Sequence, residues 1–310
     1  MKILLVGRSG QVAHELRRTL ACLGEVVALD RHSRPMLDLA DLDGLRTVVR
    51  EIKPDLIVNA AAYTAVDKAE SEAELAFRIN GEAPAVLAEV AAELGAGLIH
   101  YSTDYVFPGD ATRPYQEDDA TAPLGAYGIG KLAGEEAIRR TGASHLILRT
   151  AWVYGTRGHN FLLTMLRLLR ERELVRVVDD QRGAPTWSRL IAEVTALLIA
   201  KSNVDGRFQP GKKSGTYHLS AGGITSWHGF AVAIRAKVVA SGLLPEACAR
   251  FEPIPTSAYP TPARRPAYSV LDNAKLRREF GIALPDWETG LDLCLEERSS
   301  GCRPAEARRL

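Results

Sequence analysis

The chain has 310 residues, of which 46 % are hydrophobic and 25 % are charged, and its formal net charge is only +1. This length can bury a large core, as one α/β unit or two closely joined lobes, and the absence of a long basic run disfavours nucleic-acid binding. No apolar stretch is long enough to span a membrane, no signal peptide is visible, and the scattered cysteines suit free thiols, so we expect a soluble cytoplasmic protein.

The first predicted element is a buried strand followed by a glycine-rich turn. Residues 3–6 are continuously apolar, as in a strand that is covered on both faces of a parallel sheet. Gly7, Gly10 and Ala13 follow and lead into a helical pattern. Gly7 permits a tight turn, and Gly10 lets a diphosphate approach the backbone at the helix N-terminus. This order indicates a dinucleotide-binding loop rather than a simple strand-to-helix turn.

The second and third strands carry candidate contacts for the rest of a dinucleotide. A strand over residues 26–30 ends at Asp30, where an acid binds the adenosine ribose of NAD. The polar and basic residues 31–34 follow it and would suit the 2′-phosphate of NADP, so both cofactors stay open. Asp38 then begins a polar stretch that could hold the adenine edge. A third buried strand, 55–59, is followed by small residues that leave room for a ligand.

The fourth strand brings polar side chains to the same edge of the sheet. It is predicted over residues 97–102, and Thr103 and Asp104 follow it. A helical stretch precedes it over residues 70–94, with a kink or break marked at Asn80. Strands and helices have then alternated four times, which predicts a doubly wound parallel sheet of the Rossmann type.

Tyr127 and Lys131 are a candidate acid–base pair. They open a helix-forming run, and residues four apart stand on the same helix face. A free tyrosine has a pKa of about 10 and is a poor proton donor at neutral pH. A nearby ammonium favours the tyrosinate, so we expect Lys131 to lower the pKa of Tyr127. Any solvated helix can carry this spacing, but the pair gains weight from Thr103 upstream.

The pattern becomes irregular in the second half of the chain. A fifth strand at 146–149 is followed by a predicted helix at 160–172 and a strand at 175–178. Residues 253–266 hold too many prolines for a regular element. The arginine-rich residues 298–310 are expected to be a disordered tail.

Taken together, these motifs resemble the dTDP-4-dehydrorhamnose reductase family of the extended short-chain dehydrogenase/reductases. The resemblance runs from residue 2 to about residue 295 and rests on GRSGQV, VNAAAYTAVDKAE, HYSTDYVFPG, YGIGK, RTAWVYG, DQRGAPT, YHLSAGG and PTSAYPTPARRP. It implies a Rossmann domain, mainly residues 1–150, interleaved with a smaller C-terminal α/β lobe, mainly residues 151–297, that binds a sugar nucleotide. It also implies the last step of dTDP-rhamnose biosynthesis: NADPH- or NADH-dependent reduction of the 4-keto group of dTDP-4-dehydro-β-L-rhamnose to dTDP-L-rhamnose.

The resemblance assigns roles to particular residues. Tyr127 would donate a proton to the C4 oxygen of the sugar, and Lys131 would hydrogen-bond the nicotinamide ribose. Thr103 would orient the carbonyl oxygen, and Asp104 would contact the sugar and tune the proton transfer. Besides Gly7, the positions that match the family's cofactor contacts are Gly10, Gln11, Val12, Asp30, Asp38, Leu39, Ala62, Tyr63, Thr64 and Tyr101.

Two further residues are candidates for substrate binding. Trp152 would pack on the sugar ring, although a place in the core is an equal alternative. Arg265 is a candidate for the diphosphate, because a guanidinium pairs well with phosphate oxygens. Asp104 could also merely cap a turn. Because Tyr105 and not a glutamate follows Asp104, keto reduction fits better than the dehydration carried out by relatives with an Asp-Glu pair.

Several alternatives remain open at this point. Some family members hold Mg²⁺ at a dimer interface through a glutamate in the place of Glu15 and an acid pair after the DQRGAPT loop. Residues 187–189 supply no such pair, so no metal ligand is assigned, and both Mg²⁺ and a homodimer stay open. The alternative functions are a reductase or epimerase for another nucleotide-deoxysugar, and a non-catalytic NADP-binding regulatory subunit such as that of methionine adenosyltransferase.

Overall fold

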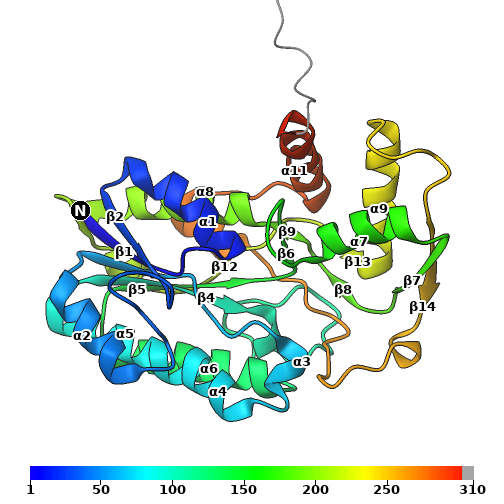
Figure 1. The fold of residues 1–310 in the computed structure, drawn as a ribbon. Helices are drawn as coiled ribbons and strands as arrows, with labels where there is room; N and C mark the ends of the chain where they lie inside the picture. Colours follow the sequence, from blue (N-terminus) through cyan, green and yellow to red (C-terminus); the bar gives the residue numbers. More distant parts are fainter. Residues whose placement is uncertain (302–310) are drawn as a thin grey trace, which may run out of the picture.

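A six-stranded sheet forms the centre of the computed structural model, which describes residues 1–301, with side chains to residue 298 (Figure 1). The strand order is β12-β5-β4-β3-β1-β2, and every neighbouring pair runs parallel. The strands are β1 (Lys2–Val6), β2 (Glu25–Leu29), β3 (Leu56–Asn59), β4 (Gly97–Thr103), β5 (His145–Thr150) and β12 (Gly215–His218). The predicted doubly wound sheet is confirmed.

The carboxyl ends of the central strands lie side by side. Val6 of β1 pairs with Asn59 of β3, and Asn59 pairs with His100 of β4. The chain continues from β1 to β2 on one side, whereas β3 lies on the other side of β1, so the strand order reverses between β1 and β3. In open α/β sheets such a reversal opens a crevice at the carboxyl ends of the strands, where ligands bind.

Helices cover both faces of this sheet (Figure 1). Successive strand residues point to opposite faces, so Ile3 and Leu5 pack on one apolar cluster and Leu4 and Val6 on another. This double burial explains the continuously apolar strand sequence. The helices of the first face are α1 (Gln11–Thr19) and α8 (Ser188–Lys201). Those of the second are α2 (Leu42–Ile52), α3 (Val66–Ala69), α4 (Ala73–Phe77), α5 (Ala83–Leu94) and α6 (Ala126–Thr141).

The expected break in the helical stretch over residues 70–94 is a turn of π-helix. This turn, η2 (Arg78–Glu82), lies between α4 and α5 and packs against α6. Glycines on α6 make the close approach possible, because a Cβ added at Gly134 would lie 2.4 Å from the carbonyl oxygen of Asn80. Because Gly134 has no side chain, α6 can pack closely against η2, and this packing fixes the position of the helix that carries Tyr127 and Lys131.

The second half of the chain builds a smaller lobe around its own apolar cluster, which contains Leu166, Phe230 and Leu291. A parallel pair, β7 (Leu174–Val178) and β14 (Arg250–Ile254), packs against α9. The helices are α7 (Phe161–Glu171), α9 (Trp227–Ala240), α10 (Ala274–Phe280) and α11 (Trp287–Gly301). The short strands are β6 (Val153–Tyr154), β8 (Arg182–Gly183), β9 (Thr186–Trp187), β10 (Asn203–Val204), β11 (Arg207–Phe208) and β13 (Thr225–Ser226). The short 3₁₀ helices are η1 (Leu20–Cys22), η3 (Asp104–Val106), η4 (Gly211–Lys213) and η5 (Thr256–Ala258).

The two halves of the sequence interleave. Strand β12 joins the main sheet, and α8 packs against α1, although both follow residue 150. The proline-rich stretch 253–266 begins inside β14. Helix α11 continues to Gly301, so the expectation of a tail beginning at residue 298 is wrong for its first four residues. The rest of that tail lies outside the described residues.

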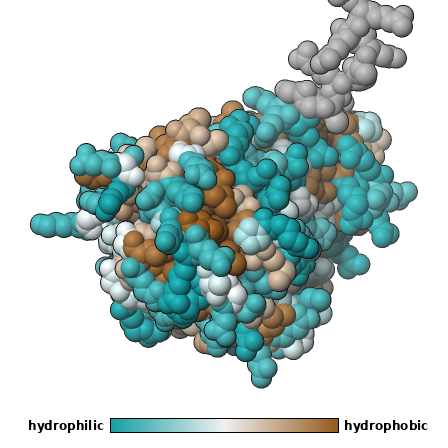
Figure 2. Space-filling view, turned by 60° about the vertical axis from the view of Figure 1, so that its left-hand side comes forward, coloured by the Kyte–Doolittle hydropathy of each residue, from teal (hydrophilic) through white to brown (hydrophobic). Residues whose placement is uncertain are grey.

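The described surface is polar with scattered apolar residues. On the face that Figure 2 shows, hydrophobic residues form small patches among hydrophilic ones. Within residues 1–301, no helix combines the length and the hydrophobicity needed to cross a membrane. The three cysteines in this part of the chain, Cys22, Cys248 and Cys294, are free thiols, and Cys302 lies beyond it.

Candidate active site

The turn after β1 has the shape that a diphosphate requires. Gly7 has a φ of +106°, which only glycine adopts readily, and it lies against the backbone of Ala60. Gly10 begins α1 without a side-chain cap, and no atom would lie within 4 Å of a Cβ added there. The first amides of α1 therefore face open space, where a helix N-terminus favours an anion. These residues fit a dinucleotide.

Two neighbours in this helix are partly buried. The Oε1 atom of Gln11 accepts a hydrogen bond of 2.9 Å from Asn160, which connects the glycine turn to the start of α7. Val12 packs against the apolar cluster on this face of the sheet. Gln11 and Val12 thus lie in the first turn of α1, directly after the glycine turn.

The carboxylate of Asp30 is already hydrogen-bonded by its own turn. The amide of His32 and the hydroxyl of Ser33 each donate to Oδ1 at 2.9 Å. Burial acts to raise the pKa of Asp30, but these hydrogen bonds outweigh it and hold the pKa below its usual value. Further along, Asp38 accepts from the amide of Ala40, and Leu39 is buried in the core, so Leu39 can offer only its backbone.

The loop after β3 is held by a residue that sequence reasoning did not assign to the site. The Oδ1 atom of Asn80 accepts from the Tyr63 amide at 2.9 Å, and its Nδ2 atom donates to the Tyr63 carbonyl at 3.0 Å. The Tyr63 hydroxyl donates to Glu72 at 2.5 Å. Ala62 is half-buried beside it, and Thr64 is exposed. The only sequence signal for Asn80 was its place at the break in the helix.

Strand β4 delivers its residues to opposite faces of the sheet. Tyr101 points into the core and its hydroxyl shares a hydrogen bond of 2.6 Å with Thr195. A side-chain contact between Tyr101 and a cofactor is therefore not available, and its carbonyl oxygen, which meets Lys131, is the group turned towards α6.

Thr103 and Asp104 form a buried pair at the end of β4. The Thr103 hydroxyl donates to Oδ1 of Asp104 at 2.9 Å, while Oδ2 has no hydrogen-bond partner among the described residues. Burial raises the pKa of Asp104 to about 6, although the neighbouring hydroxyls of Ser269 and Thr103 oppose the shift. The Thr103 oxygen also accepts from the Tyr105 amide, so Thr103 and not Asp104 caps the 3₁₀ turn that follows.

Helix α6 places Tyr127 next to this pair. Tyr127 is close enough to the Thr103 hydroxyl for that group to act on its pKa, and it meets the ring of Tyr105 edge-on at a centroid distance of 5.6 Å. A Cβ added at Gly128 would lie 2.3 Å from the carbonyl oxygen of Tyr105, so this glycine permits the contact. Thr103, Asp104 and Tyr127 are thus brought together, as the motifs predicted.

The pKa values differ from the expectation for the Tyr/Lys pair. Burial raises the pKa of Tyr127 to about 12, with the neighbouring Thr103 hydroxyl acting in the opposite direction. Burial also lowers the pKa of Lys131 to about 8, partly offset by Glu135. The expectation that Lys131 lowers the pKa of Tyr127 is therefore wrong for the ligand-free site, because desolvation outweighs any attraction from the lysine.

Trp152 is clamped on both faces. Its ring lies parallel to that of Trp227, with centroids 3.6 Å apart and an interplanar angle of 5°. A Cβ added at Gly183 would lie 2.4 Å from Cε2 and 2.7 Å from both Cζ2 and Nε1, so Gly183 covers a ring face. It must be the opposite face, because the Trp227 ring fills the first. Trp152, whose φ is +47°, therefore offers a ring edge rather than a free face for packing on a sugar.

Arg265 is held in an ion pair across the two halves of the chain. Its guanidinium meets the carboxylate of Asp67 through two hydrogen bonds of 3.0 and 2.8 Å. It also donates to the Thr261 hydroxyl. The hydrogen bond with Arg265 lowers the pKa of Asp67. Arg265, the residue predicted to bind the diphosphate, is thus half-buried and already paired with Asp67.

The acids near Glu15 are paired with arginines. Glu15 pairs with Arg18, which also meets Glu193. Arg189 pairs with Glu193 and, at 2.8 Å, with Glu297. Arginine side chains thus separate these carboxylates, and the described part of the chain holds no group of acids, histidines or cysteines suited to a metal ion.

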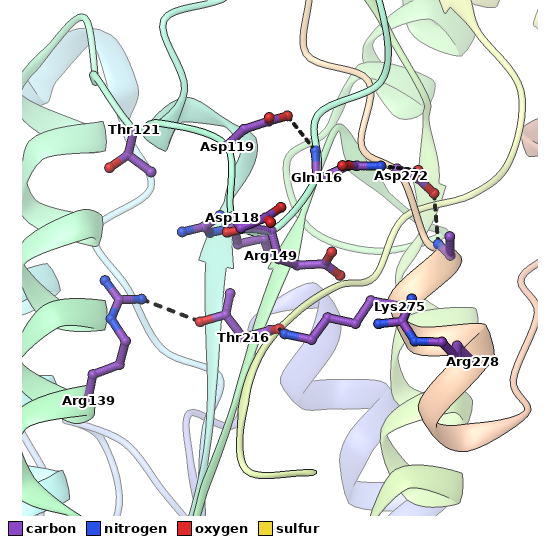
Figure 3. Close-up of a pocket in the computed structure, with 12 residues that line it drawn as sticks. Gln116, Asp118, Asp119, Thr121, Arg139, Arg149, Thr216, Asp272, Lys275 and Arg278 are labelled. Carbon is purple, nitrogen blue, oxygen red and sulfur yellow. Dashed lines mark hydrogen bonds between the residues drawn. The ribbon is translucent and has the colours of Figure 1, made fainter. Parts of the chain in front are cut away.

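A polar hollow among the described residues lies away from these residues. It measures about 590 Å³ and borders the outer edge of β12 (Figure 3). None of the predicted site residues lines it. Glu117 accepts from the amide of His218 at 2.9 Å, and Lys275 donates to the carbonyl of Thr216 at 2.8 Å. These contacts satisfy the open backbone groups of an edge strand, which is a structural task.

The fold and the arrangement of Gly7, Gly10, Thr103, Tyr127 and Lys131 define a Rossmann-type oxidoreductase that uses a nicotinamide cofactor. A family model described as the RmlD substrate binding domain matches residues 1–300. The chain belongs to this family.

Relatives and solved structures agree with this assignment. The chain is 52 % identical over 301 residues to the dTDP-4-dehydrorhamnose reductase of Burkholderia thailandensis, with 96 % of this chain and 99 % of that protein covered. Identity to the Escherichia coli dTDP-4-dehydrorhamnose reductase is 48 % over 300 residues, with coverages of 96 % and 98 %. Among solved structures, the Clostridium acetobutylicum dTDP-4-dehydrorhamnose reductase has a TM-score of 0.86 at 36 % identity, covering 96 % of this chain and 100 % of that one. The Bacillus anthracis dTDP-4-dehydrorhamnose reductase, solved in complex with NADP, has a TM-score of 0.85 at 34 % identity, with 96 % and 99 % covered.

Proposed function

We propose that the protein reduces the 4-keto group of dTDP-4-dehydro-β-L-rhamnose to give dTDP-L-rhamnose. The observation that carries this proposal is the family match over residues 1–300 together with an intact Thr103, Tyr127 and Lys131. The two relatives described above are both named dTDP-4-dehydrorhamnose reductase, and each aligns with 96 % of this chain.

The proposed roles follow from the contacts at the end of β4. When bound, the nicotinamide supplies the hydride that reaches C4. Tyr127 gives its phenolic proton to the C4 oxygen, and the Thr103 hydroxyl, which now donates to Asp104, turns to hold that oxygen. The buried carboxylate of Asp104, which the hydroxyls of Thr103 and Ser269 approach, is an acceptor suited to a sugar hydroxyl. Lys131 holds the nicotinamide ribose, and the edge of Trp152 bounds the sugar.

We propose NADPH as the preferred cofactor. Two donors of its own turn engage the Oδ1 atom of Asp30, so a ribose hydroxyl would have to use Oδ2, and Asp30 by itself does not decide between NADH and NADPH. The attraction of Arg8 also acts on Asp30, so a cation stands near this end of the site. A 2′-phosphate would be attracted by that charge. Equal kcat/KM for NADH and NADPH would contradict this preference.

A homodimer and a cytoplasmic location remain predictions that come from the resemblance. Light scattering of the purified protein measures the first, and fractionation of cells measures the second. Adding EDTA or Mg²⁺ during light scattering tests whether a metal ion takes part in assembly. We expect neither addition to change the mass, because Arg18 and Arg189 already neutralise Glu15, Glu193 and Glu297.

The first experiment is oxidation of NADPH in the presence of dTDP-4-dehydro-L-rhamnose generated in situ, with the product identified by NMR. Turnover to dTDP-L-rhamnose supports the proposal. If NADPH binds but no turnover occurs, the substrate is another nucleotide-deoxysugar or the protein is a cofactor-binding subunit. Other nucleotide 4-keto sugars in the same assay then separate these two outcomes.

A further inference from the structure

His100 lies beneath the lysine of the acid–base pair and is buried with two polar neighbours. It is 1 % exposed on β4, and Lys131 and Asn59 are 2 % and 1 % exposed. Its Nε2 atom lies 3.1 Å from Nζ of Lys131, and its Nδ1 atom lies 3.1 Å from Nδ2 of Asn59. The three side chains therefore form a chain from α6 through β4 to β3.

The orientation of Asn59 decides which ring nitrogen of His100 carries a proton. The Oδ1 atom of Asn59 accepts from the amide of Ala61 at 3.3 Å, so its NH₂ group faces His100. The NH₂ group donates, so Nδ1 of His100 accepts, and a neutral imidazole then carries its proton on Nε2. That N–H points at Nζ of Lys131 and needs a lone pair there. The arrangement is thus matched to an uncharged Lys131.

A charged Lys131 requires the opposite arrangement. An ammonium has no lone pair, so it must donate to Nε2, and the imidazole proton must then sit on Nδ1. Asn59 would have to turn its oxygen towards His100, which takes the acceptor away from Ala61. Ala61 belongs to the loop after β3, at the point where a dinucleotide is expected. The charge of Lys131 is in this way coupled to the hydrogen bonds of that loop.

We propose that His100 is a positioning residue for the reaction, which holds Nζ of Lys131 and, with Asn59, sets the charge of that lysine. Tyr101 contributes its carbonyl oxygen, which accepts from Nζ at 2.5 Å. The role of His100 is to make the uncharged state of Lys131 accessible after the lysine has given up a proton in the catalytic cycle.

The surrounding charges agree with this role. Glu135 on the same helix is paired with Arg149 of β5, and its charge still acts to raise the pKa of Lys131, against the larger effect of burial. From the other elements that pack near α6, Arg78 and Glu82 of η2 pair with each other, Glu89 and Glu93 of α5 pair with arginines of α2, and Asp104 lies beyond Tyr127. Burial lowers the pKa of Lys131 to about 8 and holds that of His100 well below its usual value.

The direct test needs neither substrate nor cofactor, so it is independent of the proposed function. NMR of the protein with nitrogen-labelled histidine reports which ring nitrogen is protonated, and the His100 signal is assigned by its loss in His100→Gln. We expect the Nε2–H tautomer in the free protein above the pKa of Lys131, and a change towards Nδ1–H as the pH falls through it. An Nδ1–H tautomer that does not respond to pH would overturn the proposal.

The kinetic test follows the alkaline limb of kcat/KM, where Lys131 loses its proton. In His100→Gln the amide oxygen can accept from an ammonium, so we expect the limb to move up by about one pH unit. In His100→Leu the uncharged amine loses the Nε2–H donor, so the limb should also move up, but by less, because no acceptor replaces the ring. His145→Gln, at a buried histidine on β5 whose Nδ1 atom meets the Ala143 carbonyl, is the matched control and should leave it in place. A uniform loss of rate at every pH in both His100 variants would show a merely structural role.

Discussion

Tyr127 is the residue on which the proposed chemistry depends most directly. Tyr127→Phe should lower kcat by a factor of about 10² to 10⁴, because the lost proton donor acts mainly in the transition state. The affinity for NADPH should stay nearly unchanged, since the ring remains in contact with Tyr105. Steady-state turnover assays measure kcat, and fluorescence titration measures the affinity for NADPH. Full activity in this variant would remove Tyr127 as the acid.

Asp104 should reduce the stability of the fold at neutral pH. Its pKa is raised to about 6 in the folded state, against 3.8 for the unperturbed group. Between these values the folded protein binds more protons than the unfolded chain, so the free energy of unfolding falls as the pH rises, by about 2–3 kcal/mol in total. Above the folded pKa the full cost is present.

Replacing this carboxyl should therefore stabilise the protein while it impairs the site. At pH 8 the free energy of unfolding of Asp104→Asn should be higher than that of the unaltered protein. This difference should shrink as the pH falls below the pKa of Asp104. Urea unfolding at several pH values measures it, with the exposed Asp118→Asn as control. A gain that is the same at every pH would contradict the burial argument. The variant should also lose activity, as is common when a group that costs stability at an active site is replaced.

At the scale of elements, β8 and α9 together hold Trp152. Gly183→Ala would place a methyl group 2.4 Å from the Trp152 ring, and the ring or the strand must move. We expect a loss of about 1–3 kcal/mol of stability from this overpacking, with reduced kcat/KM. Two stacked indoles couple electronically and give a circular dichroism signal. If the added methyl group moves the Trp152 ring away from Trp227, this signal should weaken in Gly183→Ala.

The control for this substitution is Gly290→Ala. A Cβ at Gly290 on α11 would have its nearest neighbour at 3.4 Å, an ordinary contact distance. It should leave the stability, the rate and the stacking signal unchanged. If Gly183→Ala behaves like Gly290→Ala, Trp152 is not clamped. A stacking signal that disappears when dTDP-L-rhamnose binds to the unaltered protein would show that Trp152 leaves Trp227 to meet the sugar.

At the scale of the whole molecule, Arg265 and Asp67 connect the lobe to the Rossmann sheet. Arg265→Gln should weaken binding of dTDP-L-rhamnose by about 10- to 100-fold if the guanidinium meets the diphosphate, because a charge-assisted hydrogen bond is lost. Asp67→Asn breaks the same ion pair but keeps the guanidinium, so it should bind as well as the unaltered protein or better. Calorimetry measures both affinities.

The comparison of these two variants shows whether Arg265 binds the diphosphate or has only a structural role. A half-exposed ion pair contributes only about 0–1 kcal/mol to stability, so both variants should fold. Equal affinity of Arg265→Gln and the unaltered protein would mean that Arg265 only joins the two halves of the chain.

Local patterns in the sequence were sufficient for the parts of the fold that depend on burial. Continuous apolar runs predicted the buried strands, and Gly7 and Gly10 predicted the turn before α1, because a double-sided sheet and a tight turn each restrict the residue types allowed. The spacing of Tyr127 and Lys131 and the position of Thr103 at a strand end predicted the candidate catalytic group. The resemblance added its chemistry.

Contacts between distant segments decided the rest. No local pattern shows that Asn80 holds the loop at Tyr63, that His100 meets Lys131, or that Asp67 neutralises Arg265, since each partner lies 17 to 198 residues away in the chain. The raised pKa of Tyr127 likewise follows from burial, which forms only when α6 packs on the sheet. The sequence by itself determined which strands and motifs exist, because these depend on neighbouring residues. Only the tertiary structure decided which side chains meet and how their pKa values shift. Both depend on which distant segments pack together and bury these side chains away from water.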